Sequence, residues 1–262
     1  MSAAATRSET VEVDASTGAL QTYVALPSEP GPHPGVLVIQ EVFGLTDHIR
    51  AQADKLAAAG YIAAAPDLYY LDEVRKSIDT QDIEDAIMAV VSGNPDEHIA
   101  ALPEDRQDTV RRAFEWRTGN SEKMPTFVAD ASAILSWLSA RDDVEKVGSI
   151  GWCMGGGINA AMVATGVDLD AASIWYGPLP AADKVANIKC PLELHYGTAD
   201  QLAGGIPAFE EAAKAAGKDV TSYLYEDAPH AFNNEQRASY RPDASALAWE
   251  RTWAFFAKHL GS

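Results

Sequence analysis

Residues 147–157 read Val-Gly-Ser-Ile-Gly-Trp-Cys-Met-Gly-Gly-Gly, and this stretch decides the fold. The apolar residues before the cysteine predict a strand over 146–152, and those after it predict a helix over 154–165. Cys153 stands on the turn between them, with a glycine two residues before it and another two residues after it. That arrangement is typical of a nucleophile elbow, where a sharp turn leaves room for nothing larger than glycine. A buried structural cysteine in a Gly-rich turn, or a phosphate-binding turn, is the alternative.

Strand-like and helix-like segments alternate on both sides of this turn. The predicted strands are 20–26, 36–39, 61–65, 146–152, 171–176, 192–196 and 220–225. The predicted helices are 47–59, 82–91, 124–140, 154–165, 205–216 and 244–260. Because neighbouring parallel strands need a crossover connection, this order predicts an α/β fold. We expect a mostly parallel central sheet flanked by helices on both faces, with strand 20–26 at its edge.

The 262 residues suit one α/β domain, so we expect a single domain over 1–262. The charged stretch around 93–123 interrupts the alternation and predicts a helical insertion or cap.

Composition narrows the function classes. The net charge of −18 makes nucleic acid and membrane surfaces improbable partners, since both are anionic. We find no apolar run of membrane-spanning length and no secretory signal in the segment 1–14, so the cytoplasm is the expected location. Two cysteines make no disulfide framework, and no metal-ligand spacing is present, so no metal or cofactor is expected. We expect a small-molecule substrate and a monomer or small homo-oligomer.

Two residues downstream of the elbow could complete a catalytic triad. In a parallel sheet of this kind, ligands bind beyond the carboxyl ends of the strands. Asp200 follows strand 192–196, and His230 follows strand 220–225. The order nucleophile, acid, histidine is that of an α/β-hydrolase, in which the acid orients the histidine. Asp200 could instead cap the helix that follows it, and His195, inside a strand, is expected to be a core residue.

The loop after strand 36–39 adds a further candidate group. It reads Gln-Glu-Val-Phe-Gly over 40–44. In hydrolases of this kind, the loop supplies one backbone N–H of the oxyanion hole, and the residue after the nucleophile supplies the other. Val42 and Met154 hold those two positions. Glu41 could exchange a proton with the thiol, or it could be a surface residue that caps the following helix.

Five motifs together resemble the dienelactone hydrolase (carboxymethylenebutenolidase) family, which has the α/β-hydrolase fold. They are Gln40–Gly44, Pro66–Tyr69, Gly151–Gly156, Tyr196–Asp200 and Pro229–Phe232. The resemblance implies a triad of Cys153, His230 and Asp200, with Glu41 helping to convert the thiol to thiolate. It implies hydrolysis of an ester or lactone through an acyl-enzyme, without a cofactor. We expect Phe43, Tyr69, Trp175 and Tyr176 to contact the substrate, although Trp175 and Tyr176 could equally be core residues.

The chain departs from the family at two positions. Family members usually bind the substrate carboxylate with two arginines, one after the Asp-Leu-Tyr segment and one four residues after the histidine. Here Tyr70, Leu71 and Asp72 follow the first segment, and Asn234 holds the second position. Either another arginine replaces them (Arg75, Arg237 or one within 96–123), or the substrate is a different, uncharged ester. A thioesterase or acyl transferase on the same triad, and a binding protein without activity, remain alternatives.

Overall fold

The computed structural model describes residues 6–120 and 122–261. Within them, eight strands form one sheet in the order β1-β2-β4-β3-β5-β6-β7-β8. The strands are β1 Arg7–Asp14, β2 Ala19–Leu26, β3 His33–Ile39, β4 Ile62–Pro66, β5 Val144–Trp152, β6 Ala171–Trp175, β7 Leu192–Gly197 and β8 Val220–Tyr225. Residues 1–5 of the segment searched for a signal, and residue 121 of the predicted insertion, lie outside the described residues.

Helices connect most of the strands. They are α1 Asp47–Ala58, α2 Glu73–Lys76, α3 Thr80–Val91, α4 Pro95–Ala100, α5 Glu104–Gly119, α6 Met124–Ser139, α7 Met154–Val163, α8 Ile206–Ala215 and α9 Pro242–His259, with 3₁₀ turns η1 Ala182–Asn187 and η2 Gln201–Gly205. No helix in the described ranges has the length and apolar character needed to cross a membrane.

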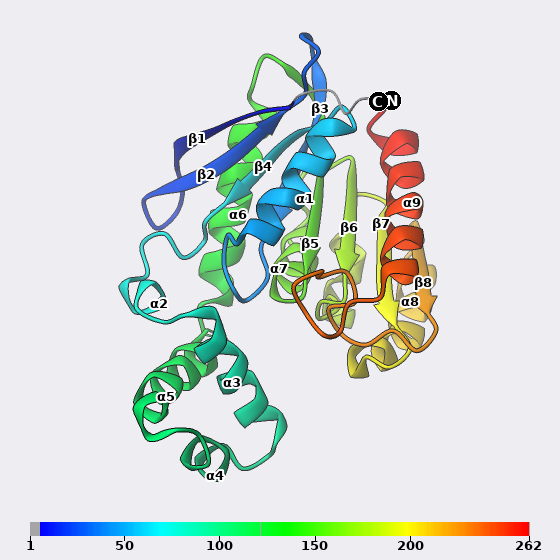
Figure 1. Cartoon of the computed structure of the whole chain (residues 1–262). Coiled ribbons are helices and arrows are strands. Elements are labelled where there is room, and N and C mark those ends of the chain that lie inside the picture. Colours follow the sequence, from blue (N-terminus) through cyan, green and yellow to red (C-terminus); the bar gives the residue numbers. More distant parts are fainter. Residues whose placement is uncertain (1–5, 121, 262) are drawn as a thin grey trace. The chain divides into compact units, whose positions relative to one another are not determined.

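The predicted fold class is confirmed. All pairs from β4 through β3 to β8 are parallel, and only β1–β2 and β2–β4 are antiparallel. Helices α1 and α9 cover one face of the sheet, and α6, α7 and α8 cover the other (Figure 1). The carboxyl ends of the parallel strands therefore lie on the same side of the sheet, where the loops with the candidate residues begin.

The expectation that strand 20–26 forms the edge is wrong. β1 pairs with β2 along its whole length and takes the edge position itself. Its sequence, Arg-Ser-Glu-Thr-Val-Glu-Val-Asp, buries only Val13 and leaves its other side chains at least partly exposed. A polar strand of this kind carries almost no hydrophobic signal and is recognised only through its hairpin partner.

The chain divides into two compact units, residues 1–68 with 128–262 and residues 69–127. The second unit holds α2 to α5 and contains the predicted helical insertion. Inside it, Arg106 forms ion pairs of 2.6 Å with Asp82 and 2.9 Å with Asp85. Tyr69 packs edge-on against Trp116. The assignment of the whole chain to one domain stays a prediction.

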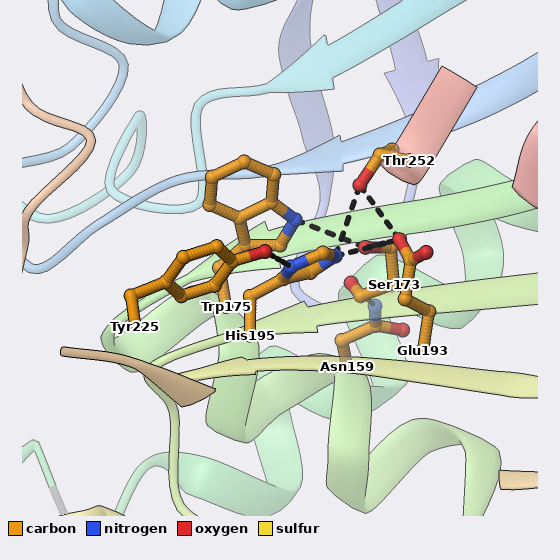
Figure 2. A network of polar contacts seen from close by, with 7 residues as sticks. All are labelled: Asn159, Ser173, Trp175, Glu193, His195, Tyr225 and Thr252. Carbon is orange, nitrogen blue, oxygen red and sulfur yellow. Dashed lines mark hydrogen bonds and ion pairs between the residues drawn. The ribbon is translucent and has the colours of Figure 1, made fainter. Parts of the chain in front are cut away.

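A buried network of hydrogen bonds connects side chains of β7, β8 and α9 in the first unit (Figure 2). His195 Nε2 lies 2.6 Å from Glu193 Oε1, and Tyr225 Oη lies 2.7 Å from His195 Nδ1. The Thr252 hydroxyl donates to the same Glu193 oxygen at 2.6 Å. Burial lowers the pKa of His195, while Glu193 opposes that effect. Because a neutral His195 can donate to Glu193 and accept from Tyr225, we assign it that tautomer.

Replacement of His195 by leucine is expected to destabilise the protein by about 3–5 kcal/mol, because it leaves the buried Glu193 without its histidine donor. Urea unfolding of wild type and variant measures the change. The matched control is the double variant with Glu193→Leu and His195→Leu, which removes both polar partners. It should lose less stability than the sum of the two single variants. Additive losses would show that the pair is not coupled.

Candidate active site

Cys153 adopts a strained backbone conformation on the turn between β5 and α7. Its φ is +53° and its ψ −117°, a region that residues other than glycine seldom occupy. Its N–H donates to the Trp175 carbonyl at 3.0 Å, and its carbonyl accepts from the Gly157 N–H at 3.1 Å. The thiol is partly exposed at the start of α7, where the helix dipole favours an anion.

The two glycines that predicted the elbow have a steric reason to be glycine. A Cβ on Gly151 would lie 2.3 Å from the Gly155 carbonyl oxygen. A Cβ on Gly155 would lie 2.3 Å from the Ile39 oxygen and 2.5 Å from the Gln40 oxygen. The end of β3 therefore packs directly on the elbow, which brings the 40–44 loop next to Cys153.

His230 and Asp200 form a close pair beside the elbow. His230 Nδ1 lies 2.7 Å from Asp200 Oδ2, and Asp200 Oδ1 accepts from the Leu202 N–H at 3.0 Å. Asp200 thus contacts the histidine and also caps η2, and its catalytic role stays a prediction. Burial alone lowers the pKa of His230. Hydrogen bonds to Asp200 and Cys153, together with their charges, outweigh burial and raise that pKa to about 10.

Glu41 is buried in the same site, with 2% of its surface exposed. Its Oε2 accepts a hydrogen bond of 2.6 Å from Asn234 Nδ2. Burial raises the pKa of Glu41, opposed by Asn234 and by the charges of Arg237 and His230. The alternative of a surface residue that caps a helix is therefore wrong.

The two predicted oxyanion positions lie on segments that meet at the elbow. Val42 is buried in the loop after β3, within a turn closed by the Gly44 N–H and the Glu41 carbonyl at 3.1 Å. Met154 is the first residue of α7. Their assignment as N–H donors to a substrate oxygen remains a prediction.

The residues expected to contact a substrate fall in different places. Tyr176 is buried edge-on against His230, and the charges of Glu41, Cys153 and Asp200 all act on its hydroxyl. Phe43 carries the Arg237 guanidinium over its ring at 3.8 Å. Trp175 packs between Trp249 and His195, which fits the core role left open from the sequence. Tyr69 belongs to the second unit and is not placed relative to this site.

Asn234 is the residue whose role sequence reasoning missed. It was noted only as the replacement for an expected arginine, whereas the structure makes it the hydrogen-bond partner of Glu41. Of the arginines considered as substitutes, Arg237 lies over the Phe43 ring and its charge acts on Glu41, and Arg75 belongs to the second unit. Among the described residues, no cluster of three or more His, Cys, Asp or Glu side chains could hold a metal ion.

Known proteins of one family resemble this chain over almost its whole length. The model of the dienelactone hydrolase family matches residues 20–260. A "Putative carboxymethylenebutenolidase" of Saccharolobus solfataricus is 31% identical over 94% of this chain and 96% of its own length. A protein of the same name from Methylorubrum extorquens is 29% identical over 95% and 80%. The crystal structure of a "Putative Dienelactone Hydrolase" from Klebsiella pneumoniae covers 97% of this chain and 99% of its own, with 27% identity and a TM-score of 0.75.

Proposed function

Because the chain belongs to the dienelactone hydrolase family, with its α/β-hydrolase fold, we propose that it hydrolyses a small ester or lactone through Cys153. The observation that carries the proposal is the convergence of three groups from separate loops. Cys153 stands on the elbow, His230 lies within its hydrogen-bonding reach, and Asp200 lies 2.7 Å from the far nitrogen of His230.

These groups support a two-step acyl transfer. The Cys153 thiolate attacks the carbonyl carbon, and the N–H groups of Val42 and Met154 stabilise the oxyanion. The intermediate collapses to a thioester as the alkoxide or enolate leaves, with His230 supplying a proton where one is needed. His230 then takes a proton from water, which attacks the thioester and releases the acid. Asp200 holds His230 in the required tautomer.

The polar groups around Cys153 indicate whether the substrate is neutral or anionic. Asn234, at the position of an expected arginine, donates a hydrogen bond to Glu41, and the charges of Arg237 and His230 act on that carboxylate. A neutral ester or lactone needs no additional positive charge at this site. An anionic lactone would need Arg237 to bind its carboxylate. Phe43, which is partly exposed, would contact the substrate, and the buried Tyr176 would support His230 from behind. The expected partner is this small molecule, and the expected location is the cytoplasm.

A comparison of two substrates tests the proposal. Hydrolysis of dienelactone and of a neutral activated ester is measured for wild type and for Arg237→Gln. Turnover of both, with loss of dienelactone turnover alone in the variant, would assign the carboxylate to Arg237. Turnover of the neutral ester alone would support an uncharged substrate. If neither is cleaved, the proposed reaction fails.

A further inference from the structure

The contact between Asn234 and Glu41 joins the loop after His230 to the loop after β3. The two residues are 193 positions apart in the sequence, and each has 2% of its surface exposed. We propose that Asn234 is a positioning residue, whose side-chain amide holds Glu41 in the site as an ionised carboxylate. This inference rests on the proposed function for its catalytic meaning and on the contact itself for its geometry.

The orientation of the Asn234 amide is set by its own loop. Its Oδ1 accepts the Gln236 N–H at 3.0 Å, so its Nδ2 is the atom that faces Glu41. The backbone holds the turn as well, because the Asn234 N–H donates to Ala231 and its carbonyl accepts from Arg237. A carboxylate oxygen accepts a hydrogen bond from an amide N–H more strongly than a neutral carboxyl does, and a protonated carboxyl would also need an acceptor for its own O–H. The contact therefore favours the ionised form of Glu41.

The other groups that act on Glu41 come from the loop that carries His230 and Asn234, from the loop of Glu41 itself and from the residue after β6. The Arg237 guanidinium lies over Phe43, and its charge acts on Glu41 together with that of His230. The charge of Glu41 also acts on the buried hydroxyl of Tyr176, which directly follows β6. Burial is the largest influence and raises the pKa of Glu41, and the hydrogen bond from Asn234 is the largest influence that lowers it. Asn234 thus contributes strongly to the pH at which Glu41 loses its proton.

An ionised Glu41 acts on the triad through His230. The negative charge of Glu41 favours the imidazolium form of His230, and an imidazolium in turn stabilises the Cys153 thiolate. Because Asn234 contacts Glu41, its effect on the reaction is expected to depend wholly on the carboxylate of Glu41. That dependence separates a positioning role from a purely structural one.

The test uses Asn234→Asp, which keeps the size and the Oδ1 acceptor but replaces the N–H donor with an oxygen, and Asn234→Ala as the second variant. Infrared difference spectroscopy follows the protonated carboxyl band of Glu41, which Glu41→Gln identifies. Loss of one hydrogen bond to a charged group should raise the pH at which Glu41 ionises by about one to two units in Asn234→Ala. Asn234→Asp should raise it further, since two adjacent carboxylates then share a proton.

The kinetic counterpart is the acidic limb of kcat/KM for the neutral activated ester. It should move upward with the infrared titration in both variants, and neither substitution should move it in a Glu41→Gln background. An unchanged Glu41 titration in both folded variants would overturn the proposal, as would a kinetic shift that persists without the Glu41 carboxylate. A wild-type protein without Cys153-dependent hydrolysis would instead refute the proposed function, and the infrared titration would still decide the inference about Glu41.

Discussion

Replacement of Cys153 by alanine is expected to lower kcat for ester hydrolysis by a factor of about 10⁴ to 10⁶. Alanine keeps the oxyanion positions and the His230–Asp200 pair but removes the atom that forms the acyl-enzyme. The residual rate would come from the binding of substrate and the stabilisation of the oxyanion alone. The initial rate with a neutral activated ester, and the burst of product in the first turnover, measure the loss.

The chain supplies its own control for this experiment. Cys190 is the other cysteine, and it is buried with the pKa of its thiol raised to about 11, chiefly by burial. Cys190→Ala should therefore keep both the hydrolysis rate and the burst. If Cys153→Ala retained the wild-type rate, or if Cys190→Ala lost it, the assignment of the nucleophile would be wrong.

The elbow and its two partners could be predicted from the sequence because their signals are local. Gly151 and Gly155 flank Cys153 on a strand-to-helix turn, and a Cβ on either of them would lie 2.3 Å from a backbone oxygen, which excludes any side chain. Asp200 and His230 each follow a predicted strand, and parallel strands end at the same edge of a sheet. Topology alone therefore predicts that they meet.

Other features depend on contacts between distant segments and could not be predicted. Asn234 has no local pattern that predicts a bond to Glu41, since that contact exists only after the two loops have packed. His195 could be assigned to the core, but its partners Tyr225 and Thr252 come from another strand and a helix. The strand β1 was missed because its exposed polar sequence carries little hydrophobic alternation.

Replacement of Asp200 by asparagine is expected to lower kcat by about 10³ to 10⁴, with little change in KM. Asp200 Oδ1 accepts from Leu202, so an asparagine that keeps this bond presents its N–H₂ group to His230 Nδ1. Two donors cannot face each other, and His230 would turn to the tautomer that carries its proton on the nitrogen facing Cys153. It could then no longer take a proton from the thiol or from water.

The pH dependence should change in a defined direction. Burial lowers the pKa of His230, and Asp200 is the group that raises it most. Loss of the Asp200 carboxylate should therefore lower the pKa of His230. The basic limb of kcat/KM should move to lower pH with it. Because the folded-state pKa of about 10 exceeds the ordinary value of about 6.5, protonated His230 stabilises the fold fully below pH 6.5. That contribution is lost as the pH rises through 10, and it should shrink in Asp200→Asn. The His230 side chain is 39% exposed, so solvent screening reduces the size of this effect.

The matched control is Asp227→Asn, the same change at an exposed aspartate in the loop that carries His230. It removes one negative charge from that loop but leaves Asp200, the partner of His230 Nδ1, unchanged. We therefore expect kcat and the basic limb of kcat/KM to stay at their wild-type values. Rates for the three proteins between about pH 6 and pH 10 give the comparison. Equal losses in both variants would mean that Asp200 acts only through its negative charge. A loss confined to Asp200→Asn would identify the hydrogen bond to His230 as the cause.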